Sequence, residues 1–145
     1  MSYLIDTNVI LRRLQPAHPM SGQAAQALRS LHARGESLCV IPQNVIEFWG
    51  VATRPSTMNG LGLTPLQAEH EVAELERLFA VLPEFPGTFT RWRQLVCAHA
   101  VSGRQVHDAH LVAAMLTHGI SHILTFNDDD FARYGEVTVV NPASV

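Results

Sequence analysis

Three acidic residues stand where alternating strands and helices would bring them to one edge of a sheet. Asp6 directly follows the apolar run Tyr3–Ile5, and Asp108 stands at the head of an apolar helical segment. Glu47 lies about 200° around its helix from Val45, away from the apolar stripe of that helix, so its carboxylate can face a cleft. A single acid at such a position often only caps a helix or faces solvent. The three gain significance together.

A run of aspartates at residues 128–130 follows the apolar segment His122–Thr125. Charge runs are usually solvated and adjacent carboxylates repel each other, so we expect one ligand here, either Asp128 or Asp130. Oxygen ligands favour hard cations, which predicts Mg²⁺ or Mn²⁺ rather than zinc. One or two such ions activate water and stabilise charge on a phosphodiester. The acids therefore indicate the chemistry of a metal-dependent nuclease.

The composition predicts a single globular domain over residues 1–145. Hydrophobic residues make up 47% and charged residues 16%, which favours a packed core over disorder. We find neither a signal-peptide pattern nor an apolar run of about eighteen residues, so we expect a cytoplasmic protein with no membrane segment. Cys39 and Cys97 lie in apolar surroundings and are expected to be buried thiols. The net charge of −3 counts mildly against a polyanionic substrate.

The elements that must position the acids alternate along the chain. We expect strands at 3–5, 38–41, 80–82, 122–125 and 137–140. We expect helices at 9–14, 20–33, 42–53, 65–79, 88–101 and 109–116, and a helical turn at 129–134. The loop at 55–63 is rich in turn residues, so we expect it to be exposed, mobile and available to a substrate or partner. The alternation predicts an α/β fold of three α/β/α layers around a mostly parallel sheet of four to five strands.

Four segments and a tail share the order and spacing of the motifs of a known family: Leu4–Ile10, Asn44–Phe48, Val106–Leu111, Leu124–Phe131 and Val139–Pro142. In these segments the chain resembles PIN domains, and within them the VapC-like toxins of bacterial toxin–antitoxin pairs. The resemblance assigns the first three acidic positions to Asp6, Glu47 and Asp108, and leaves the fourth between Asp128 and Asp130.

The resemblance also implies roles for polar and basic residues around these acids. Asn8 and Thr125 would orient the acidic ligands, and Asn127 stands where some members carry a polar substitute. The residues that flank the expected cleft and are candidates for RNA contacts are Arg54, Arg104 and His107.

The implied activity is cleavage of single-stranded or structured RNA, including tRNA or ribosomal RNA, with Mg²⁺ or Mn²⁺. The implied partners are a second copy of the chain and a small antitoxin protein. The resemblance answers the objection from net charge, because bound metal neutralises the acidic pocket and local basic residues contact the RNA.

Three other interpretations remain open. A PIN-like scaffold that binds RNA or protein without turnover would keep the fold. An aspartate-nucleophile phosphatase would also begin with a strand and Asp6, but such enzymes usually need a second aspartate where Asn8 stands. A zinc site is the third, since His107 and His110 have the spacing to share a helix face, yet no Cys or third His stands at ligand spacing, which favours ordinary surface or core histidines.

Overall fold

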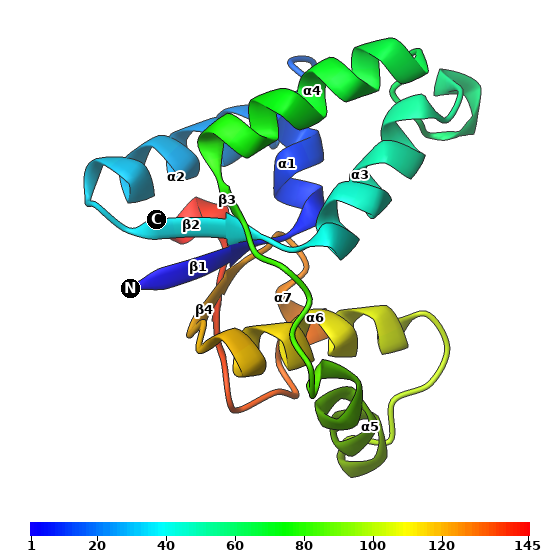
Figure 1. Ribbon diagram of the computed structural model, residues 1–145. Helices are drawn as coiled ribbons and strands as arrows, with labels where there is room; N and C mark the ends of the chain where they lie inside the picture. The colour runs from blue at the N-terminus through cyan, green and yellow to red at the C-terminus, as the bar shows by residue number, and fades with distance from the viewer.

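A central sheet of five parallel strands runs through the computed structural model, which describes residues 1–145 (Figure 1). The strand order is β3-β2-β1-β4-β5. The strands are β1 (Ser2–Ile5), β2 (Ser37–Val40), β3 (Ala80–Val81), β4 (His122–Leu124) and β5 (Thr138–Val140). Every strand pair is parallel, and β1 pairs with both β2 and β4 at the centre. The expected parallel sheet is confirmed.

Helices cover both faces of this sheet (Figure 1). One layer contains α1 (Thr7–Arg13), α2 (Ser21–Ala33), α3 (Pro42–Thr53) and α4 (Pro65–Leu78). The other layer contains α5 (Thr88–Ala98) and α6 (Gln105–His118). The short elements are the 3-10 turns η1 (Ser56–Met58) and η2 (Pro142–Ser144) and the single-turn helix α7 (Asp128–Phe131). The predicted α/β/α layering is confirmed.

The strands present alternate residues to the two helical layers. Ile5 and Val40 belong to a core of 17 buried residues shared with α1–α4, whereas Leu4 and Ile123 belong to a core of 15 shared with α5 and α6. Two cores of similar size bury the central strands on both sides. Strands buried on both faces appear in sequence as continuous apolar runs, as Tyr3–Ile5 of β1 does.

Several helix boundaries differ from the expectation. α6 begins at Gln105 rather than at residue 109. The apolar pattern did not predict this first turn because most of its residues are polar. α5 ends at Ala98 rather than at 101, since Ala100 takes a left-handed conformation with φ of 50°. α1 begins at Thr7, two residues early, with Asp6 as its N-cap.

The prediction of two buried thiols is half wrong. Cys39 is buried in β2, but Cys97 is exposed on α5. α5 lies at the outside of its layer and buries Leu95 on the face towards α6. Cys97 therefore lies on the side that no element covers.

The loop at 55–63 is largely exposed, as expected, but backbone hydrogen bonds fasten it to the end of α3. Leu61 N donates to Val51 O at 3.1 Å, and Leu63 N donates to Ala52 O at 2.9 Å. These bonds fix where α4 begins and argue against free motion of the loop. No helix in the molecule combines the length and apolar character required to span a bilayer.

Candidate active site

Asp6 lies at the carboxyl edge of the sheet, directly after β1. Its backbone N–H donates to Leu124 O at 3.0 Å, which continues the pairing of β1 with β4. Only 7% of the residue is exposed. Oδ1 accepts from the backbone N–H of Thr7 at 2.7 Å, and Oδ2 accepts from the hydroxyl of Thr125 at 2.7 Å. Asp6 is thus both a helix cap and a buried carboxylate with two fixed donors.

Glu47 reaches the same edge from α3. Its Oε2 accepts from the Thr7 hydroxyl at 2.9 Å. Since the backbone N–H of Thr7 bonds Asp6, one residue connects the two carboxylates. The buried Asn44 also donates to the Thr7 hydroxyl, at 3.4 Å, and so helps to hold it. The predicted orientation of Glu47 towards a cleft is consistent with these contacts.

Asp108 approaches from the other helical layer, in the first turn of α6. Burial, and to a smaller extent the charges of Asp6, Asp130 and Glu47, raise its pKa to about 7 against the opposing effect of Arg133. Asp108 therefore lies close enough to each of these three acids for their charges to act on it. An ordinary aspartate would be ionised well below neutral pH.

The pKa of Asp6 is raised to about 6, again mainly by burial. The hydrogen bonds from Thr125 and Thr7 favour the charged form, but they do not offset the desolvation and the repulsion from Glu47 and Asp130. Neighbouring acids with raised pKa values are typical of functional clusters that a cation neutralises.

Asp128 and Asp130, in the aspartate run after β4, have different surroundings. Asp130 is partly buried in α7 and raises the pKa of both Asp6 and Asp108 by its charge. Asp128 is exposed and accepts from the amide of Asn141 at 2.8 Å, towards the C-terminus. The geometry therefore favours Asp130 over Asp128 as the fourth acid of the cluster.

The polar residues expected to orient the acids form a network beneath them. Thr125 is fully buried and donates to Asp6, while Asn8 Nδ2 donates to the Thr125 hydroxyl at 3.3 Å. Asn8 Oδ1 accepts from the Phe126 backbone N–H at 3.3 Å. Asn127 contributes its backbone N–H to Thr125 at 3.0 Å, whereas its exposed side chain makes no cap hydrogen bond.

The three basic residues predicted to flank the cleft lie on different parts of α3 and α6. His107 is exposed and lines a cavity of about 420 Å³ together with Glu47. Arg104 is the exposed N-cap of α6, and Arg54 is exposed at the far end of α3. The cation whose charge lowers the pKa of Asp108 is Arg133, which was not among the predicted basic residues.

Other residues of the site also escaped the sequence interpretation. Thr7 stood inside the Asp6 motif without an assigned role. Gln43 donates to Glu47 and contacts His110, and no role was predicted for it. Its spacing of four residues from Glu47 on the same helix is a signal of contact that could have identified it.

A family model described as the PIN domain matches residues 3–137. The chain belongs to the PIN-domain family. The resemblance stated from the motifs is thereby confirmed, and the match includes Asp6, Glu47, Asp108 and Asp130. No curated protein sequence gives a significant match to the chain.

Solved structures similar to this PIN domain include a toxin–antitoxin complex from Klebsiella pneumoniae, which is 20% identical, with a TM-score of 0.65 and coverage of 99% of both chains. FitAcB from Neisseria gonorrhoeae is 23% identical, with a TM-score of 0.70 and coverage of 99% of both chains. VapBC2 from Rickettsia felis, bound to a DNA fragment from its promoter, is 15% identical, with a TM-score of 0.72 and coverage of 97% of this chain and 98% of that one. VapC20 from Mycobacterium tuberculosis, a sarcin-ricin loop cleaving toxin, is 18% identical, with a TM-score of 0.67 and coverage of 93% and 96%. At these identities the likeness shows a shared fold.

The donor set of this PIN domain fits a hard divalent cation. Its acids offer only oxygen ligands and repel one another, so a cation between them would relieve a cost that the raised pKa values record. No three His, Cys, Asp or Glu side chains stand together as a ready ligand group. Mg²⁺ commonly binds one or two carboxylates and keeps several waters, so it does not require such a group.

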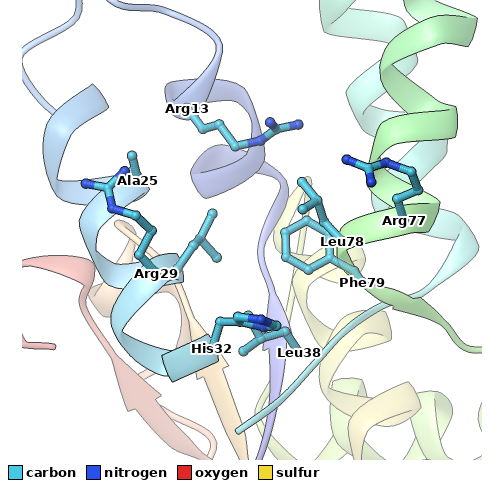
Figure 2. Close-up of a pocket in the computed structure, with 9 residues that line it drawn as sticks. Arg13, Ala25, Arg29, His32, Leu38, Arg77, Leu78 and Phe79 are labelled. Atoms are coloured by element: carbon cyan, nitrogen blue, oxygen red, sulfur yellow. The ribbon is translucent and has the colours of Figure 1, made fainter. Parts of the chain in front are cut away.

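A second cavity, of about 550 Å³, is lined by none of these acids. Figure 2 shows Arg29 of α2 and Arg77 of α4 on opposite sides, with Arg13 of α1 between them. Leu28, Leu38, Leu78 and Phe79 supply its apolar lining. The Arg13 guanidinium has two buried nitrogens without a hydrogen-bond partner, and its contact with Glu71 is 3.9 Å long.

Proposed function

We propose that this PIN domain is a metal-dependent endoribonuclease and the toxin of a toxin–antitoxin pair. The observation that supports the proposal is that Asp6, Glu47 and Asp130, from three different elements, lie close enough to Asp108 on α6 for their charges to raise its pKa. An acidic cluster of this kind is unfavourable in the folded protein and needs a functional reason. Family membership supports nuclease chemistry as that reason.

The proposed ligands of a Mg²⁺ or Mn²⁺ ion are Asp6, Glu47, Asp108 and Asp130. Such an ion, when bound, supplies activated water and stabilises charge on the phosphodiester under attack. Thr125 and the Thr7 backbone fix the Asp6 oxygens, and the Thr7 hydroxyl fixes one oxygen of Glu47. Prepositioned carboxylates lose little freedom on binding, which favours the productive geometry.

The proposed substrate is single-stranded or structured RNA, of the tRNA or ribosomal RNA class. VapC20, a structural relative, is described as cleaving the sarcin-ricin loop, and this supports a structured RNA target. We propose that His107 and Arg104 at the start of α6, and Arg54 at the end of α3, contact the phosphate backbone. Basic side chains position such a backbone without reading its sequence.

The proposed partners are a second copy of the chain and a small antitoxin. A structural relative from Klebsiella pneumoniae is a toxin–antitoxin complex, which supports such a partner here. The cavity between Arg13, Arg29 and Arg77 suits an antitoxin segment that is both apolar and acidic, since it combines an apolar lining with guanidinium groups. Arg29→Glu should weaken co-purification with the antitoxin at least tenfold and leave RNA cleavage unchanged. Normal pairing of Arg29→Glu would remove this cavity from the interface.

RNA cleavage by the purified protein tests the proposed activity. With Mn²⁺ or Mg²⁺ the wild type should cut RNA, and Asp6→Asn and Asp108→Asn should be inert. Removing the metal with EDTA should stop cleavage reversibly. Variants that cut at the wild-type rate would refute the assignment, and RNA binding without cleavage would favour the non-catalytic scaffold. The phosphatase alternative lacks its second acid, because Asn8 stands at that position. The Asn8 side chain is instead hydrogen-bonded to Thr125 and to the backbone of Phe126.

A further inference from the structure

Gln43 connects three parts of the site through one side-chain amide. It lies on α3 one turn before Glu47, and its Nε2 donates to Glu47 Oε1 at 2.7 Å. The same nitrogen donates to the backbone carbonyl of His107 at 3.0 Å. Its Oε1 is hydrogen-bonded to Nδ1 of His110. Both N–H donors and the carbonyl of the amide are therefore engaged.

These three partners permit one orientation of the Gln43 amide. In the opposite orientation its oxygen would face the Glu47 carboxylate and the His107 carbonyl, which are both acceptors. The oxygen must then accept from His110, so Nδ1 of that ring carries the proton. The contact fixes the amide and the tautomer together.

The amide also links the two helical layers. α3 contributes Phe48 to the core under α1–α4, whereas α6 contributes Val112 to the core on the other face of the sheet. Through Gln43, the helix that carries Glu47 is bonded to the helix that carries Asp108. These contacts cross from one layer to the other beside the carboxylates.

Glu47 needs such a restraint because its neighbours repel it. The charges of Glu47, Asp6 and Asp108 act on one another, and an unrestrained glutamate on a helix surface can turn to solvent. The Thr7 hydroxyl holds Oε2, so the Gln43 amide is the donor that holds the other oxygen. With both oxygens bonded, the carboxylate is held in one place.

We propose that Gln43 is a positioning residue that holds Glu47 in the carboxylate cluster, and that His110 sets the orientation of Gln43. The inference rests on the proposed function, since it concerns a proposed ligand. It deepens that function by assigning a task to two side chains outside the acidic motif.

Binding of Mn²⁺ to the full chain, measured by calorimetry, tests the proposal without RNA. Gln43→Met keeps the length of the side chain but removes all three hydrogen bonds, and should weaken binding about tenfold. His110→Leu should weaken it similarly, and His110→Asn, whose amide N–H can replace Nδ1–H, should restore most of the affinity. Gln94→Met, at an exposed site on α5, is the matched control. All variants should keep the wild-type melting temperature within a few degrees.

The double variant Gln43→Met/His110→Leu distinguishes positioning from general damage. If His110 acts through Gln43, the double variant binds Mn²⁺ no more weakly than Gln43→Met alone. Wild-type affinity in Gln43→Met, or losses that add in the double variant, would overturn the proposal.

The outcome separates this inference from the proposed function. If the wild type binds Mn²⁺ in a Gln43-dependent manner but cuts no RNA, the positioning role stands and the nuclease assignment fails. If the wild type binds no Mn²⁺, a crystal structure of Gln43→Met decides the matter. A displaced Glu47 carboxylate supports the positioning role, and an unmoved one refutes it.

Discussion

Thr125 and Asp6, 119 residues apart in the sequence, are joined by a hydrogen bond of 2.7 Å from the threonine hydroxyl to Oδ2 of the aspartate. The bond joins the ends of β4 and β1, which are neighbouring strands of the sheet. Thr125 is fully buried, and Asp6 has one other donor, the Thr7 backbone. A threonine directly after β4 therefore determines how one oxygen of a buried acid is satisfied.

Removing that hydroxyl should damage both stability and metal binding. Thr125→Val keeps the shape of the side chain but leaves Oδ2 of Asp6 without its donor. An unsatisfied buried acceptor costs about 1–3 kcal/mol of unfolding free energy, and loss of a partner that orients a ligand weakens metal affinity about tenfold or more. Urea unfolding and Mn²⁺ titration measure the two effects. Thr125→Ser retains the hydroxyl and should behave nearly as the wild type; a Thr125→Val protein with normal values in both assays would contradict the role.

The raised pKa of Asp108 predicts that metal-free protein loses stability as the pH rises. The pKa is near the ordinary value of 3.8 in the unfolded chain and about 7 in the folded protein. Between these values the folded state binds more protons, so the unfolding free energy falls from about pH 4 to pH 7 and stays lower above. Asp108→Asn escapes this loss. After allowance for solvent screening we expect a gain of about 1 kcal/mol at pH 8, or about 3 °C in Tm.

Thermal melts at pH 4 and pH 8 in EDTA test the sign of this effect. The gain of Asp108→Asn should vanish at pH 4, where both proteins are neutral at this position. Saturating Mg²⁺ should reverse the order at pH 8, because only the wild type keeps the full ligand set. Asp129→Asn, an exposed acid in the same run as Asp130, serves as control. An Asp108→Asn variant that is less stable at pH 8 without metal would show that the acid is not under repulsion.

Gly50 within α3 and Gly60 in the loop after it should respond oppositely to alanine. A Cβ at Gly60 would lie 2.0 Å from the backbone oxygen of Arg54, so Gly60→Ala must displace the loop that the Leu61 and Leu63 bonds fasten to α3. We expect a loss of about 2 kcal/mol. Gly50 lies inside α3 with nothing within 4 Å of a Cβ, so Gly50→Ala should gain up to about 1 kcal/mol. Urea unfolding measures both, and a stabilised Gly60→Ala would show that the loop yields freely.

The sequence was sufficient for the parts of the site that depend on strand ends. The placement of Asp6 and Asp108 was predictable because an acid after a buried strand, or at the head of a buried helix, reaches the carboxyl edge of a parallel sheet; their role as ligands stays a prediction. The fold followed from the same alternation of apolar runs. The start of α6 could not be predicted in this way, because its first turn carries mainly polar residues and lacks an apolar pattern.

The rest of the site depends on side chains that meet only in the folded chain. Thr7 touches Glu47 across 40 residues and Gln43 touches His110 across 67, and no local pattern marks such pairs. For His110 the sequence offered a zinc ligand or an ordinary surface or core histidine, because histidine spacing is visible in sequence and an amide partner is not. Cys97 was misjudged for a related reason, since apolar neighbours in sequence do not show which side of a helix remains uncovered.

The choice between Asp128 and Asp130 was also beyond the sequence, and cleavage kinetics can test the answer from the fold. In α7, the charge of Asp130 raises the pKa of Asp6 and of Asp108, whereas Asp128 accepts a hydrogen bond from Asn141 at the surface. Asp130→Asn should therefore lower kcat/KM at limiting Mn²⁺ at least a hundredfold, or about 2.7 kcal/mol. Asp128→Asn should change it less than threefold. Because both variants remove one negative charge from the same turn, a general electrostatic effect on RNA binding would move them equally. Equal losses would thus reject Asp130 as the fourth acid, and a larger loss in Asp128→Asn would reassign that role to Asp128.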